Sequence, residues 1–151
     1  MTEKQIRYSF SPSLGYIAFY DSAISFMPES EFNSSDLRNK IIKRSGCFSL
    51  YPEDALDVVI DISLAMQPLP LNDDAVQWIH IVEGVIAVKS GKLCVTSTVR
   101  PQADFFMDNG NYDFRVCFSA VNSETDSCNV SLYFWKTDNQ ETNEIKVLKQ
   151  R

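Results

Sequence analysis

A two-residue alternation between Tyr112 and Ala120 constrains the fold of this chain more than any other pattern. Apolar side chains stand at the even positions and polar side chains or cysteine at the odd ones, with Tyr112, Phe114, Val116 and Phe118 set against Asp113, Arg115, Cys117 and Ser119. Successive side chains of a β-strand point to opposite faces, so the pattern predicts a strand with one buried face. Residues 58–66 repeat it, with Val58, Ile60, Ile62, Leu64 and Met66 on one face. Both runs are typical of antiparallel sheets.

Further runs rich in β-branched and aromatic residues predict more strands. They are Leu14–Tyr20, Val76–Val82, Val85–Val88, Leu93–Val99 and Val130–Trp135. Glu83-Gly84 and Ser90-Gly91 fall between three of these runs, and glycine supplies the positive φ that tight turns require. The sequence therefore predicts a three-stranded meander from residue 76 to residue 99.

One segment has the pattern of a helix. Asn33 to Asp36 are residues that favour a helix N-terminus, and Leu37, Ile41 and Ile42 then fall on one face. Lys43 and Arg44 precede Gly46, a combination that favours a helix C-terminus. We expect a helix over about residues 34–45.

The order of these elements indicates a mostly β fold. About seven to eight short strands with one α-helix predict an antiparallel β-sandwich. The length of 151 residues suits one domain, and no linker interrupts the chain, so we expect a single domain over residues 1–151. Residues 137–151 are charged and predict a flexible tail.

Composition bounds the environment of the protein. No stretch approaches the roughly 20 apolar residues that a membrane span requires, and the polar start of the chain lacks the apolar segment of a secretion signal. We expect a cytoplasmic protein. The cysteines have no paired spacing, so we expect free thiols and no cofactor or structural metal at Cys47, Cys94, Cys117 and Cys128.

The residues that could carry chemistry do not form a catalytic pattern. His80 is the single histidine, and no nucleophile turn accompanies it. Residues 108–113 resemble a calcium loop, but the glycine stands at the third position instead of the sixth. Phosphate-cradling glycine motifs are absent, and a pair such as Asp57 and Asp61 also suits a solvated strand face. We therefore predict a non-enzymatic protein with no catalytic residues.

Charge is distributed unevenly along the chain. The net charge is −6, and residues 51–75 alone carry six acidic and no basic side chains. Nucleic acids and anionic membranes attract Lys and Arg, so neither is an expected partner. Two interpretations remain open: the acidic residues lie in solvated loops and keep the protein soluble, or they form a contact surface for a basic protein. The candidate residues of that surface are Glu53, Asp54, Asp57, Asp73, Asp74, Asp104 and Asp108.

Two tryptophans are candidate anchors for a partner. Trp78 and Trp135 stand in predicted strands, and Tyr133 shares a face with Trp135 opposite Leu132 and Phe134. The Tyr133 and Trp135 face either packs against the helix or contacts a partner. An alternative function is a small-molecule or carbohydrate-binding sandwich that uses Trp78 or Trp135.

The layout from residue 10 to residue 122 resembles the ComJ-like family of bacterial nuclease inhibitors, which are competence proteins. The resemblance lies in the aromatic strand Tyr16–Tyr20, the helix Ser35–Arg44, the segment Gly46–Leu50 before the strand Val58–Leu64, the meander through Glu83-Gly84, and Phe106–Val116. It implies an inhibitor or immunity protein that binds and neutralises a nuclease. No binding residue carries over, and the chain from Asn122 onward is an addition to the layout.

Overall fold

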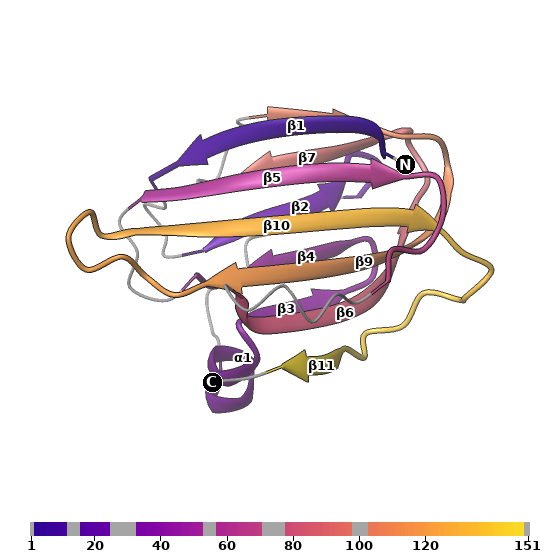
Figure 1. Ribbon diagram of the computed structural model, residues 1–151. Helices are drawn as coiled ribbons and strands as arrows, with labels where there is room; N and C mark the ends of the chain where they lie inside the picture. The colour runs from indigo at the N-terminus through magenta and orange to yellow at the C-terminus, as the bar shows by residue number, and fades with distance from the viewer. Residues whose placement is uncertain are drawn as a thin grey trace.

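Two β-sheets stacked face to face form the protein (Figure 1). The computed structural model describes residues 2–11, 16–24, 33–52, 57–70, 78–97 and 103–149. The six-stranded sheet has the order β1 (Thr2–Phe10), β5 (Asp57–Ala65), β10 (Ser127–Lys136), β9 (Gly110–Ser119), β6 (Trp78–Val88) and β11 (Lys146–Lys149). The five-stranded sheet has the order β3 (Ile41–Arg44), β4 (Cys47–Leu50), β2 (Ile17–Asp21), β7 (Lys92–Thr96) and β8 (Ala103–Phe106). The predicted mostly β sandwich is confirmed. The described residues form eleven strands rather than about seven to eight, because the nine-residue strand β1 and the four-residue strands β3, β4, β8 and β11 were not predicted.

One pair of strands breaks the antiparallel rule. β10 runs parallel to β5, with Ser127 opposite Asp57 and Phe134 opposite Leu64. Parallel neighbours need a long connection, and here the chain between them builds β6 to β9. The pairing brings the β9–β10 connection beside the start of β5, which matters for the site described below.

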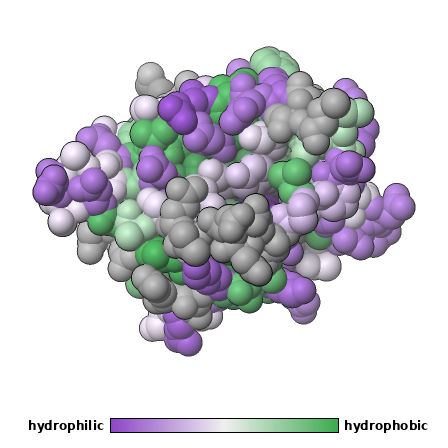
Figure 2. All heavy atoms as spheres, in the orientation of Figure 1, coloured by the Kyte–Doolittle hydropathy of each residue, from purple (hydrophilic) through white to green (hydrophobic). Residues whose placement is uncertain are grey.

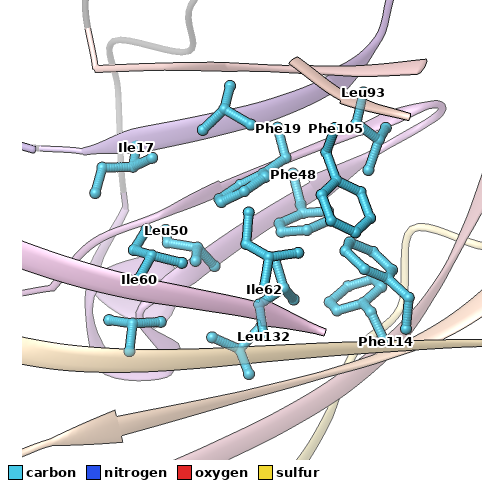
Figure 3. Close-up of a cluster of buried hydrophobic side chains, with 14 of the residues drawn as sticks. Ile17, Phe19, Phe48, Leu50, Ile60, Ile62, Leu93, Phe105, Phe114 and Leu132 are labelled. Atoms are coloured by element: carbon cyan, nitrogen blue, oxygen red, sulfur yellow. The ribbon is translucent and has the colours of Figure 1, made fainter. Parts of the chain in front are cut away.

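The core lies between the sheets and is rich in phenylalanine. The alternation predicted a buried even face, and this is confirmed: Ile60, Ile62, Phe114, Val116 and Phe118 are all at most 1% exposed. Rings from both sheets meet there, and the rings of Phe48 and Phe114 stack at 4.4 Å between centroids (Figure 3). Met66 was assigned to the same face, but β5 ends at Ala65 and Met66 is 60% exposed.

The predicted helix over 34–45 is too long. α1 covers Ser34–Asn39, with Asn33 and Asp36 forming a capping box. Lys40 then takes a left-handed conformation, with φ of 61°, and β3 begins at Ile41. Ile41 and Ile42 are both buried, on opposite faces of a strand, because β-branched residues fit a strand that is covered on both sides. Burial in the sheet therefore overrides the helical spacing of Leu37, Ile41 and Ile42.

The predicted meander is also wrong. Glu83-Gly84 lies within the continuous strand β6, and Ser90-Gly91 leads from β6 into β7 of the opposite sheet. Gly84 is needed for space rather than for a turn. A Cβ atom at this position would lie 2.6 Å from Cζ of Phe114, whose ring covers the glycine.

We expect Gly84→Ala to destabilise the protein by about 1–3 kcal/mol, because the added methyl group displaces the Phe114 ring from the core. Urea unfolding would measure the change. Ala87→Gly at a half-buried position of the same strand is a control for backbone entropy, with an expected cost of about 0.5–1 kcal/mol. A Gly84→Ala variant as stable as the parent would contradict the proposed close contact.

The C-terminal segment, predicted from the sequence as a flexible tail, makes defined contacts among its described residues. β11 pairs with β6 through Lys146 opposite Glu83 and Val147 opposite Val82. Oε2 of Glu141 accepts hydrogen bonds from Nζ of Lys43 at 3.0 Å and from the backbone N–H groups of Gly46 at 2.8 Å and Ala87 at 3.0 Å. One carboxylate thus joins the segment to both sheets.

Candidate binding surface

The outer face of the six-stranded sheet carries mostly polar and aromatic side chains in rows that cross the strands, and Ser63, Arg115, Cys117 and Ser131 among them are buried. The pairing register defines three rows that end on β1. The first row starts on β6 and contains Trp78, Ser119, Asn129, Val59 and Ser9. The second and third rows start on β9 and contain Cys117, Ser131, Asp61 and Arg7, and Arg115, Tyr133, Ser63 and Gln5, respectively. Rows are about 7 Å apart along the strands, and neighbouring strands are about 4.8 Å apart. This face is toward the viewer in Figure 2.

A groove of about 610 Å³ lies on this face and crosses β1, β5, β10 and the ends of β9 and β6. Its floor carries serine hydroxyls at positions 63, 119 and 131 and side-chain amides at positions 5 and 129. In its middle, Nε of Arg7 donates to Oδ1 of Asp61 at 2.7 Å, and the second Arg7 nitrogen donates to Oδ2 at 3.1 Å. The hydrogen bond with Asp61 raises the pKa of Arg7. The groove is therefore polar, with its central charges paired.

Trp78 stands at one end of the groove because of an irregularity in β6. Trp78 pairs with Ser119 and His80 pairs with Phe118, so β6 has one extra residue between these two pairs. Such a bulge re-aims a side chain. Trp78 consequently lies half-buried in the groove, whereas His80 is fully buried, with its ring 5.5 Å from that of Phe118. Parity alone would place Trp78 and His80 on one face, and the extra residue separates them.

Trp135 is not a surface anchor. It is 5% exposed, and its Nε1 donates to Asp113 at 3.1 Å. The Arg115 guanidinium lies 5.2 Å from the Trp135 ring and donates to Glu83 at 2.8 Å. Asn139 and Ile145 of the C-terminal segment line the small pocket beside the ring. The C-terminal segment therefore lies beside Trp135, where the sequence predicted either the helix or a surface open to a partner.

The acidic candidates do not form one surface among the described residues. Asp57 lies on the outer face one row beyond Asn129, where it accepts a hydrogen bond from Ser11 at 2.7 Å. Asp104 stands on β8 in the other sheet and pairs with Lys92, and Asp108 pairs with Lys136 at the far end of β10. Ser127 opposite Asp57 and Lys136 mark the two ends of β10, about 30 Å apart. Glu53, Asp54, Asp73 and Asp74 lie outside the described residues.

Two further acidic residues lie in the connection that adjoins Asp57. Glu124 and Asp126 are exposed in the β9–β10 connection, and the backbone N–H of Asp57 donates to the carbonyl of Asp126 at 3.1 Å. We call Asp57, Glu124 and Asp126 the acidic end. It adjoins the first row of the groove, and Figure 2 shows this end of the molecule, at the left, largely hydrophilic. Glu124 and Asp126 were not among the predicted candidates, because their position relative to Asp57 depends on the pairing of β5 with β10.

Among the described residues, the candidates considered for catalysis make other contacts. Within the described ranges, no three His, Cys, Asp or Glu side chains lie close enough to hold a metal ion. His80 Nε2 lies 2.7 Å from the Asn39 carbonyl, and Asp61 is bound to Arg7. Burial raises the pKa of Cys117 to about 11, so its thiol is protonated at neutral pH. The described part of the chain also contains no helix that is long and apolar enough to cross a membrane.

Comparison with solved structures identifies relatives of the fold. No protein-family model and no curated protein sequence matches the chain. The structure of ComJ from Bacillus subtilis, an inhibitor of the DNA-degrading activity of NucA, is similar with a TM-score of 0.71 and 12% identity, over 91% of this chain and 98% of ComJ. The crocagin biosynthetic gene J product is similar with a TM-score of 0.54 and 15% identity, over 87% of this chain and 95% of that one. The resemblance predicted from the order of elements is therefore confirmed at the level of the fold, which this chain shares with ComJ.

Proposed function

We propose that the protein is a non-enzymatic, acidic binding protein of the bacterial cytoplasm that inhibits a basic protein partner, most concretely a nuclease. The observation that carries the proposal is the similarity to ComJ over nearly the whole of both chains. An inhibitor of this kind needs a binding surface, and the described residues offer a groove and an acidic end.

Charge supports the choice of partner. The chain has a net charge of −6, and an acidic protein steers toward a basic surface and away from nucleic acid. A nuclease active site binds phosphate groups and is rich in positive charge, so carboxylates imitate its substrate. The charge and the fold thus favour the same class of partner from independent observations.

The experiment is capture of the partner followed by an assay of its activity. The tagged chain is incubated with lysate of its native host, the retained protein is identified by mass spectrometry, and the purified partner is assayed for DNA degradation. We expect a basic nuclease whose activity falls to zero at a one-to-one ratio with the chain. A retained protein that keeps full activity, or that is acidic, would contradict the proposal.

The same assay tests the role of charge. Replacing Glu53, Asp54, Asp73 and Asp74 by their amides removes four negative charges from the region richest in them. We expect slower association with the partner at low salt and a weaker dependence of the association rate on salt, because salt screens electrostatic steering. Circular dichroism and urea unfolding would verify that the variant is folded.

A further inference from the structure

We propose that the partner docks on the outer face of the six-stranded sheet, with Trp78, Arg7 and Tyr133 as its anchors and the acidic end as its steering rim. This inference rests on the proposed function and assigns it a surface. The expected partner surface is basic around its rim and presents a protruding loop to the groove.

The anchors are residue types that dominate binding energy at protein interfaces. Trp, Tyr and Arg are enriched among residues whose truncation weakens binding most. Here Trp78 and Tyr133 are half-buried, and the Arg7 side chain is 71% exposed. All three side chains are therefore held by the sheet at one end and remain accessible to a partner. Arg7 is held by both Asp61 oxygens, which lowers the entropy lost when a partner binds it.

The β6 bulge gives a second, independent reason to place the site here. In a strand with regular pairing, Trp78 would share the parity of His80 and face the core. The strand breaks its register here, and its tryptophan lies in a polar groove instead of the core. Docking of a partner on Trp78 is a reason for such an arrangement, whereas solubility alone favours a small polar residue.

Size and charge indicate a protein rather than a small ligand. The distance from Arg7 to Trp78 covers four strand spacings, about 19 Å, and three rows cover about 13 Å, or roughly 250 Å². A stable interface buries about 800 Å² per partner, so the groove forms the centre and the adjoining acidic end extends it. Because Arg7 and Asp61 neutralise each other, the carboxylates of Asp57, Glu124 and Asp126 set the charge that a partner must complement.

The test uses the full chain and the partner recovered in the nuclease assay, with binding rates measured by surface plasmon resonance. We expect Trp78→Ala and Arg7→Ala each to weaken affinity by about 10- to 100-fold, mainly through faster dissociation. Asn129→Arg places a bulky cation on an exposed position of the groove and should abolish binding without affecting the core. Asn109→Arg is the matched control at an exposed position beside Asp108, and Trp135→Phe is the buried tryptophan control; both should bind normally.

The acidic end is tested by charge-matched variants. Asp57→Asn, Glu124→Gln and Asp126→Asn combined should lower the association rate about 3- to 10-fold at low salt, with the difference lost at high salt. Asp108→Asn, Asp138→Asn and Glu144→Gln remove the same charge elsewhere and should change the rate less. Asparagine tolerates the φ of 50° at position 126, so the first variant keeps its turn.

The outcomes separate this inference from the proposed function. If the wild-type chain inhibits a basic nuclease and Trp78→Ala and Asn129→Arg inhibit it equally well, the docking surface is wrong and the function stands. If no basic partner is recovered, both proposals fail. Binding of neutral oligosaccharides such as cellohexaose or maltohexaose, lost in Trp78→Ala and kept in Trp135→Phe, would assign the groove to a carbohydrate and overturn the inference.

Discussion

Phe114→Ala is expected to destabilise the protein by about 3–5 kcal/mol, the largest effect of any substitution considered for this chain. Phe114 is fully buried, and its ring stacks on Phe48 of the opposite sheet at 4.4 Å and covers Gly84 of the neighbouring strand. Truncation therefore opens a cavity at the contact between the two sheets, where the rigid strands cannot close it. Urea unfolding of the purified variant measures the loss.

The control for Phe114→Ala is an outward position of the same sheet. Asn129 is exposed on the outer face, so Asn129→Ala is expected to change stability by no more than about 0.5 kcal/mol. Arg115 is unsuitable as a mild control, because it is 9% exposed and bound to Glu83. Equal and small effects of Phe114→Ala and Asn129→Ala would show that the buried face has been assigned wrongly.

Alternation predicted the inward faces of the long strands well, because period two is a local property of a half-buried strand. The alternation rule failed for strands whose two faces are both buried. Ile41 and Ile42 have helical spacing from Leu37, yet they occupy a strand covered from both sides. Gly84 appears in sequence as a turn residue, and the reason for its presence is the Phe114 ring from a strand 30 residues away.

The site was less predictable than the fold because its residues meet through pairings that the sequence does not show. Trp78 was identified as an anchor from its residue type, but the bulge that aims it into the groove has no local signal. The acidic end depends on the parallel pairing of β5 with β10, which joins Asp57 to residues almost 70 positions later. Trp135 has the same residue type as Trp78 and is buried, so residue type alone does not identify an anchor.

Glu141→Ala is expected to destabilise the protein by about 2–4 kcal/mol, although Glu141 lies in the segment predicted to be flexible. The Lys43 side chain is fully buried, and Glu141 is its carboxylate partner at 3.0 Å. Removing one partner of a buried ion pair leaves the other charge uncompensated, which typically costs about 3–5 kcal/mol. The Glu141 side chain is 17% exposed, so water recovers part of that loss.

Three variants apportion the effect of Glu141. Glu141→Gln keeps an acceptor for the Gly46 and Ala87 N–H groups and removes the charge, so it should cost less than Glu141→Ala. Lys43→Met combined with Glu141→Gln removes both charges and should be more stable than Glu141→Ala. Limited proteolysis between residues 137 and 149 should quicken in Glu141→Ala, because the segment loses its contact with both sheets. Cleavage at the parental rate would show that this carboxylate does not fix the segment.

The pH dependence of the Glu141→Ala effect follows from Lys43. Burial lowers the pKa of Lys43 below that of the unfolded chain, while the hydrogen bond and charge of Glu141 raise it. In Glu141→Ala the contributions of Glu141 that raise the pKa of Lys43 vanish, and this pKa falls further.

Between the folded and unfolded pKa values of Lys43, the unfolded chain binds more protons than the folded protein, so stability rises with pH in that range. The stability deficit of Glu141→Ala should therefore be largest near neutral pH and shrink as the pH rises toward and beyond the ordinary lysine value of 10.5, above which Lys43 is neutral in both states. Urea unfolding of parent and variant at a series of pH values measures the deficit, and a deficit independent of pH would show that backbone contacts, rather than the buried charge, account for the role of Glu141.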